Sequence, residues 1–144
     1  MIGKYIYKNK INLRFTDFDS YGIAHHSKYL VWLEECRIAF INMVDKNNIW
    51  EKYRFLLTSV AVEYKKAVLF EDDYEIFMKV EMNEEIPKIC FDYKIINLQT
   101  NRICATASTK HIITDNTNHI LIDIPLELKN MMKNISSMEE KICT

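Results

Sequence analysis

One stretch of the chain is apolar at helical spacing, and this constrains the fold more than any other feature. Its apolar side chains recur at three- and four-residue steps at Tyr29, Leu33, Cys36, Phe40 and Met43, with Trp32, Ala39 and Val44 widening the stripe. Such spacing places side chains on one face of an α-helix. We predict a helix of about five turns that begins at Ser27, its N-cap, and ends near Lys46.

Most of the remaining sequence alternates between apolar and polar residues instead. A period of two is typical of half-buried β-strands. It occurs before the helix in residues 4–15, where Tyr5, Tyr7, Ile11, Leu13 and Phe15 share a side, and after it in residues 60–65, 74–81, 88–95 and 102–114. The polar connections NEEIP, NLQTN and DNTN are short enough for hairpins, which predicts that the strands they join are antiparallel neighbours.

Two shorter helices are also predicted. The first spans about residues 48–53, where Asn48 and Glu51 have the spacing of a capping box. The second, PLELKNMMKN, is opened by Pro125 and is expected to pack on the edge of the sheet.

Together these segments predict an α+β fold in which a curved antiparallel sheet of five or six strands wraps one long helix. The small side chains of Ala105 and Ala107 fall on one face of their strand, which would let the helix lie close. A sheet covered by one helix keeps open edges and a second face. We therefore expect a homo-oligomer, a dimer or a tetramer.

Composition narrows the classes of function. A chain of 144 residues without a linker or repeat is expected to be one domain, residues 1–144. Its 19 basic and 20 acidic residues nearly cancel, which argues against a nucleic-acid partner. Lysines interrupt the N-terminal segment and no apolar run is long enough to span a bilayer, so we predict no membrane insertion and a cytoplasmic location. The four cysteines form no CxxC pair and are expected to be reduced thiols.

The segment FTDFDSYGIAHHSKY, residues 15–29, gathers titratable side chains immediately before the long helix. Gly22, one of only two glycines, separates Asp19 from His25 and His26. A turn with positive φ, or close approach of a ligand, would explain a glycine there, and turn chemistry alone would account for DSYG. The alternative is functional: backbone N–H groups at a helix start stabilise negative charge on a carbonyl oxygen, and a nearby aspartate acts as base or nucleophile.

Metal binding is not expected at this segment. Adjacent histidines point in different directions, and no third ligand lies at a spacing typical of zinc sites. The combination of an aspartate with an N–H-presenting helix end favours acyl transfer instead.

Two blocks of the sequence resemble a known family. RFTDFDSYGIAHHSKYLVWLEECR, residues 14–37, is similar to the signature of the 4-hydroxybenzoyl-CoA thioesterase family of hot-dog-fold acyl-CoA thioesterases, in particular its bacterial YbgC-like branch. LLTSVAVEYKKAVLFEDDYEI, residues 56–76, resembles the family's strand ending in Tyr, its polar stretch and its DD pair. Ala67 departs from the family's usual proline and Tyr21 from its usual small residue, so the acyl preference is expected to differ.

The resemblance implies a hot-dog fold and hydrolysis of an acyl thioester. It assigns the catalytic carboxylate to Asp19, as nucleophile or general base, with assistance from His26, and it makes Asp17 a structural turn residue. The role of His25 stays open because relatives carry an aromatic residue there. The expected substrate-binding residues are Gly22, His25, Ser27, Tyr29, Thr58, Ser59, Lys65 and Lys66, the lysines serving the coenzyme A phosphates. No separate cofactor is implied, since coenzyme A is part of the substrate.

Three alternatives remain open. The acyl group could be carried by acyl carrier protein rather than coenzyme A. The chain could be a hot-dog hydratase, although the DxDxxG turn argues against it. It could also bind acyl thioesters without cleaving them.

Overall fold

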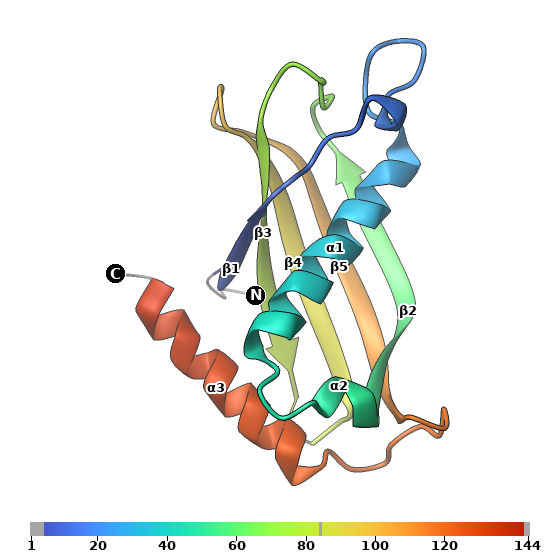
Figure 1. Ribbon diagram of the computed structural model, residues 1–144, viewed down its shortest axis with the longest axis vertical. Helices are drawn as coiled ribbons and strands as arrows, with labels where there is room; N and C mark the ends of the chain where they lie inside the picture. The colour runs from blue at the N-terminus through green and yellow to red at the C-terminus, as the bar shows by residue number, and fades with distance from the viewer. Residues whose placement is uncertain (1–4, 84, 143–144) are drawn as a thin grey trace.

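The computed structural model describes residues 5–83 and 85–142 and places one long helix across one face of an antiparallel sheet (Figure 1). Within this part of the chain, the strands are β1 (Tyr7–Lys10), β2 (Tyr53–Tyr64), β3 (Tyr74–Met82), β4 (Lys88–Asn97) and β5 (Arg102–Asp115). The helices are α1 (His26–Val44), α2 (Ile49–Lys52) and α3 (Leu126–Ile142), with a 3-10 turn at Phe15–Asp17. The predicted α+β class with a five-stranded sheet is confirmed.

The strand order is β1-β3-β4-β5-β2, and every neighbouring pair is antiparallel. The predicted hairpins between β3 and β4 and between β4 and β5 are confirmed. β2 precedes β3 in the chain but pairs with β5, so it forms the edge opposite β1. This crossover brings the end of β2 close to the start of α1 (Figure 1).

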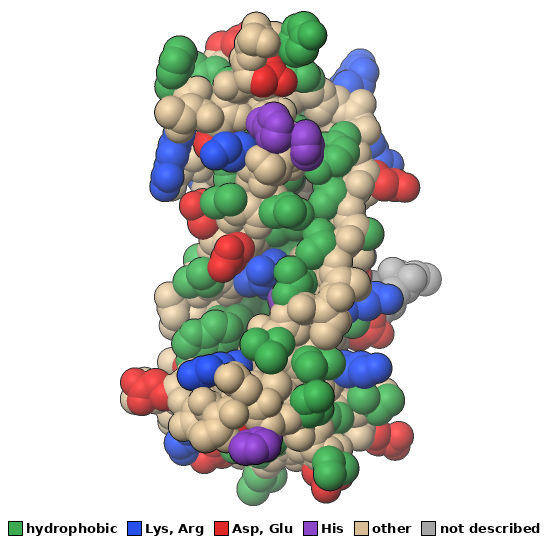
Figure 2. Space-filling model, turned by 90° about the vertical axis from the view of Figure 1, so that its right-hand side faces the viewer, with side chains coloured by type: hydrophobic (Ala, Val, Ile, Leu, Met, Phe, Trp, Pro, Cys, Tyr) green, Lys and Arg blue, Asp and Glu red, His purple; other side chains and the backbone are tan. Residues whose placement is uncertain are grey.

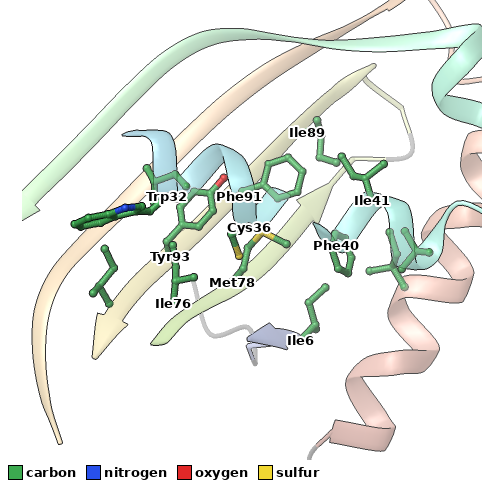
Figure 3. Packing of buried hydrophobic residues seen from close by; sticks show 14 of the residues in the cluster. Ile6, Trp32, Cys36, Phe40, Ile41, Ile76, Met78, Ile89, Phe91 and Tyr93 are labelled. Atoms are coloured by element: carbon green, nitrogen blue, oxygen red, sulfur yellow. The ribbon is translucent and has the colours of Figure 1, made fainter. Parts of the chain in front are cut away.

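The core lies between α1 and the sheet (Figure 3). The predicted inward faces of β3 and β4 are confirmed by the buried residues Tyr74, Ile76, Met78, Ile89, Phe91, Tyr93 and Ile95. Ala105 is buried and Ala107 packs against the core, as expected of the small residues on β5. On α1 the predicted stripe is wrong at Met43, which is 45% exposed, whereas Ile41 is buried. Helical period does not specify which flank the neighbouring elements cover.

The predicted first strand is largely wrong. β1 spans only four residues, and the buried positions beside it are Ile6 and Ile11. Phe15, expected to face inward, is 83% exposed and begins the 3-10 turn. The reason is that pairing with β3 stops near Ile11, so alternation no longer governs which side chains are buried.

Two predicted caps are also wrong. α1 begins at His26 and its N-cap is His25, not Ser27, because His25 Nδ1 accepts a hydrogen bond from the Ser27 N–H at 3.3 Å. Asn48 precedes α2 but its side chain makes no cap. The carboxylate of Asp45 accepts the free N–H groups there, from Ile49 at 2.8 Å and from Trp50 at 3.0 Å.

The chain turns back at DNTN as predicted, but no named strand follows β5. The Asp115 carboxylate accepts hydrogen bonds from the Thr117 and His119 N–H groups. The returning segment is joined to β5 by the Thr114–Ile120 bridge and by backbone hydrogen bonds from Asp115 N–H to the His119 carbonyl at 3.0 Å and from Leu121 N–H to the Ile113 carbonyl at 3.1 Å. α3 is longer than predicted; it runs beside the β1 edge and contacts α1 (Figure 1). Its buried residues are Leu128, Met131, Met132 and Ile135.

Three of the four cysteines lie among residues 5–83 and 85–142. Cys36, Cys90 and Cys104 are free thiols, whereas Cys143 lies outside the described residues. Within the described chain no helix is both long and apolar enough to cross a membrane. Nor do these residues include a group of three His, Cys, Asp or Glu side chains placed to hold a metal ion.

A chain of polar side chains lies buried between α1 and the sheet. Arg37 Nη1 donates to Tyr93 Oη at 3.1 Å, Tyr93 Oη lies 2.9 Å from Thr109 Oγ1, and Thr109 Oγ1 lies 3.0 Å from His111 Nε2. Burial and the nearby Arg37 charge lower the pKa of His111 to about 4. His111 is therefore neutral in the folded protein at neutral pH.

We expect the free energy of unfolding to fall as the pH is lowered from 6.5, the ordinary pKa of histidine, to about 4. In this window the unfolded His111 binds a proton that the folded one does not, so acid favours unfolding. Urea unfolding at pH values above and within the window measures this for wild type and His111→Gln. His111→Gln should lose part of the pH dependence of the free energy of unfolding. His119→Gln, a control at an exposed histidine, should keep it. Equal pH dependence in all three proteins would mean that His111 is not its source.

Candidate active site

The turn between the 3-10 segment and α1 is fixed by its own backbone. Asp19 N–H donates to the Ile23 carbonyl and Gly22 N–H donates to the Asp19 carbonyl, each at 3.0 Å. Gly22 has a φ of 76°, which agrees with the first of the two explanations offered for a glycine here, positive φ or close approach of a ligand. A Cβ at Gly22 would meet no atom within 4 Å, so the left-handed conformation, not crowding, is what requires glycine.

The two aspartates of the turn have different surroundings. Asp17 is buried; its Oδ2 accepts the Arg14 N–H at 2.9 Å, and its Oδ1 lies 4.0 Å from Lys28 Nζ. Asp17 is thus the structural turn residue that was predicted. Asp19 is half-buried, and its Oδ1 accepts the Tyr21 N–H at 2.8 Å. Its Oδ2 has no hydrogen-bond partner in the described chain, which leaves one carboxylate oxygen free to face a ligand.

The start of α1 presents one free backbone donor. Ser27 N–H donates to His25 Nδ1, and Lys28 N–H donates to the His25 carbonyl at 3.0 Å. The N–H of His26 makes no hydrogen bond to any residue that the structure describes. Because His25 Nδ1 accepts, the proton of its neutral ring is assigned to Nε2. The His25 and His26 rings lie 4.0 Å apart (Figure 2).

A cleft of about 330 Å³ opens between this turn, the start of α1 and the end of β2. It is lined by Asp19, Ile23, Ala24, His26, Tyr29, Tyr64, Lys65, Lys66 and Ala67. Five of the residues proposed from the sequence are therefore brought together: Asp19, His26, Tyr29, Lys65 and Lys66. Burial raises the pKa of Tyr29 to about 12, so this phenol stays protonated.

Tyr64 is the main residue of the cleft that sequence reasoning did not assign. Its Oη donates to the His26 carbonyl at 3.1 Å, and its ring packs edge-on against Tyr29 with centroids 4.8 Å apart. Ile23 and Ala24 were also missed, whereas Ala67 had been singled out as a departure from the family's usual proline. In the sequence, the one signal for Tyr64 was its place at the end of the strand in residues 56–76, where the family also has a Tyr. Its contact with His26 could not be predicted, because that contact depends on where β2 lies beside α1.

Other proposed residues lie outside the cleft of one protomer. Gly22, His25 and Ser27 shape the turn and the helix start but do not line the cleft. Thr58 and Ser59 lie at an irregularity in β2, where Thr58 Oγ1 donates to the Lys110 carbonyl at 3.1 Å. Both are five or six residues before Tyr64, about 17–20 Å along the strand.

Comparison with known proteins identifies the family. Residues 13–137 match the sequence profile of the Thioesterase-like superfamily. The chain belongs to this superfamily. A protein of Aquifex aeolicus named "Putative esterase" is 28% identical over 134 residues, which cover 90% of this chain and 98% of that protein. The match is to the superfamily, and the narrower 4-hydroxybenzoyl-CoA, YbgC-like assignment stays a prediction.

Solved structures of thioesterases share the fold. A 1,4-dihydroxy-2-naphthoyl-CoA thioesterase from Synechocystis has a TM-score of 0.76 at 13% identity, covering 90% of this chain and 97% of its own. A thioesterase from Thermus thermophilus complexed with coenzyme A and Zn also has a TM-score of 0.76 at 13% identity, covering 92% and 96%. The predicted hot-dog fold is confirmed for this member of the Thioesterase-like superfamily.

Proposed function

We propose that the protein hydrolyses acyl-CoA thioesters to a free acid and a thiol. One observation carries the proposal: a single cleft is lined by Asp19, whose Oδ2 has no hydrogen-bond partner among the described residues, and by His26, whose backbone N–H makes no hydrogen bond to them. A carboxylate beside a preorganised backbone donor is the arrangement that thioester hydrolysis requires. Membership of the Thioesterase-like superfamily supports the same reaction class.

The reaction would proceed by one of two routes. The thioester carbonyl oxygen accepts the His26 N–H, where the positive end of the α1 dipole adds stabilisation. Asp19 either takes a proton from a water that adds to the carbonyl carbon, or attacks that carbon itself to form an anhydride that water then opens. In both routes the C–S bond breaks, and the thiolate takes up a proton. The ring of His26 lines the cleft and is proposed to assist at this step.

Coenzyme A is proposed as the carrier and enters as part of the substrate, so no further cofactor is needed. Lys65 and Lys66 are exposed at the rim of the cleft, and neither has a carboxylate within 4 Å among the described residues. They are suited to the phosphates of coenzyme A. The Thermus thermophilus thioesterase of the same fold is a complex with coenzyme A, which supports this carrier over acyl carrier protein.

We propose that two protomers join through β2. This strand is 12 residues long and forms a sheet edge, and Leu56, Leu57 and Val60 are 37% to 51% exposed on it. Residues 55–62 in the middle of this edge carry no charged side chain, and an apolar edge of that length favours pairing with a second strand. Antiparallel pairing of two β2 strands, in a register that sets Thr58 and Ser59 opposite the C-terminal end of the partner's β2, would bring these two residues toward the partner's cleft.

Leu57→Lys should weaken self-association by about tenfold or more, because a lysine side chain would be buried against the second protomer. Sedimentation over a range of concentrations measures this. Leu98→Lys, at a similarly exposed leucine in the β4–β5 hairpin, is the matched control and should associate like wild type. A monomeric wild type, or equal association of both variants, would rule out the β2 interface.

The decisive experiment is a turnover assay with a panel of acyl-CoA and acyl carrier protein thioesters. Release of free thiol from acyl-CoA supports the proposal, and faster release from the protein-bound thioesters would reassign the carrier. Binding without hydrolysis would instead support a scaffold role. Water addition to an enoyl thioester would indicate a hydratase.

A further inference from the structure

Arg37 lies on the same line of α1 as the proposed reaction centre. One face of the helix carries His26, then Leu33 seven residues later, and Arg37 four residues after that. Arg37 follows His26 by 11 residues, or about 16 Å along the axis. A group bound beside Arg37 would therefore lie well below a carbonyl held at the start of the helix.

Arg37 is a half-buried cation without an acidic partner. No carboxylate of the described residues lies within 4 Å of it, and one of its nitrogens, Nη1, is bonded to Tyr93 Oη. Guanidinium groups removed from water are normally paired with an anion. The remaining N–H groups of Arg37 therefore offer an unused site for an oxygen acceptor.

In the polar chain that begins at Arg37, each side chain donates its hydrogen bond to the next one along the chain. Tyr93 accepts from Arg37, so its own proton goes to Thr109, and the Thr109 proton goes to His111 Nε2. His111 Nδ1 then carries the ring proton, and this buried atom has no hydrogen-bond partner among the residues that the structure describes. The Phe55 backbone acts to raise the His111 pKa, but it makes no hydrogen bond of acceptable geometry with Nδ1. The region supplies donors and no anionic acceptor.

Exposed apolar side chains of α1 and of the proposed β2 interface lie between the cleft and this chain. Leu30, one turn after His26 on α1, is 44% exposed, and Val60 and Leu57 of β2 are 37% and 51% exposed. Val60 pairs with Thr109 and Leu57 with His111, so both lie beside the polar chain. Figure 2 shows hydrophobic side chains running down this face from the histidine pair.

We infer that Arg37 determines substrate specificity by binding a carboxylate at the far end of the acyl group. This inference rests on the proposed thioesterase function and names its substrate class: thioesters in which one carboxyl of a long-chain dicarboxylic acid is joined to coenzyme A. The apolar side chains accompany the methylene chain, and the guanidinium pairs with the terminal carboxylate, a geometry that arginine satisfies with two parallel hydrogen bonds. Tyr93, Thr109 and His111 hold the guanidinium in position.

The test compares saturated acyl-CoA thioesters of increasing length in matched pairs that end in a methyl group or a carboxylate. Wild type should show a kcat/KM at least about tenfold higher for the carboxylate member at lengths that span about 16 Å. Arg37→Gln should lose this preference while still hydrolysing the methyl-ended thioesters. Arg54→Gln, at an exposed arginine bonded to Asn118, is the control and should keep it. Tyr93→Phe should reduce the preference without abolishing it.

The outcomes separate this inference from the proposed function. Hydrolysis of both members at equal rates would overturn the role of Arg37 and leave the thioesterase function standing. Weaker self-association of Arg37→Gln with an unchanged preference would also overturn it, because the arginine would then belong to a protomer contact. If no thioester is hydrolysed, the proposed thioesterase function is wrong. Calorimetry with free dicarboxylic and monocarboxylic acids then tests whether Arg37 binds a carboxylate. Tighter binding of the dicarboxylic acid by wild type but not by Arg37→Gln would support the site; equal binding would overturn it.

Discussion

Asp19→Asn should lower kcat for thioester hydrolysis by about a hundredfold to ten-thousandfold, the usual contribution of a positioned base. Asparagine has the same shape, and its side-chain oxygen still accepts the Tyr21 N–H that closes the turn. The substitution therefore removes the negative charge and the basic oxygen of a residue that lines the cleft, while the turn is kept. The measurement is thiol release under saturating acyl-CoA.

The matched control for this variant is Asp123→Asn, at an exposed aspartate in the segment before α3. It should hydrolyse like wild type. Circular dichroism and the thermal midpoint establish that each variant is folded. A folded Asp19→Asn with near wild-type kcat would remove Asp19 from the mechanism, whichever of the two routes is assumed.

Phe91→Ala should lower the free energy of unfolding by about 3–5 kcal/mol, as expected for a fully buried phenylalanine. Phe91 of β4 is 0% exposed, and its ring lies beside the ring of Tyr93 (Figure 3). It also packs edge-on against the ring of His111. Truncation would leave a cavity beneath α1, because strands on both sides prevent β4 from moving inward. Urea unfolding followed by circular dichroism gives the difference.

A second phenylalanine provides the comparison. Phe15 is 83% exposed, and Phe15→Ala should change the free energy of unfolding by less than about 1 kcal/mol. Similar losses in the two variants would mean that the core does not lie between α1 and the sheet. A loss confined to Phe91→Ala would support the packing described above.

Local sequence patterns were sufficient for the central elements of the fold and for the turn before α1. Alternation along β3 and β4 predicted their buried faces, since each strand lies between two others and under α1. Gly22 was predicted from its scarcity and position, and its φ of 76° agrees. The pattern failed at residues 12–15, where pairing with β3 ends and burial no longer follows a period of two.

The sequence by itself therefore determined the long helix, the alternating strands and the aspartate-glycine turn, because each depends on residues only a few positions apart. The tertiary structure alone decided that β2 pairs with β5, which places Tyr64 against the His26 carbonyl 38 residues away. It also decided that Arg37 meets Tyr93, 56 residues away, beneath α1. Such contacts follow from strand order and the crossing of α1 over the sheet, and neither is encoded in a local period.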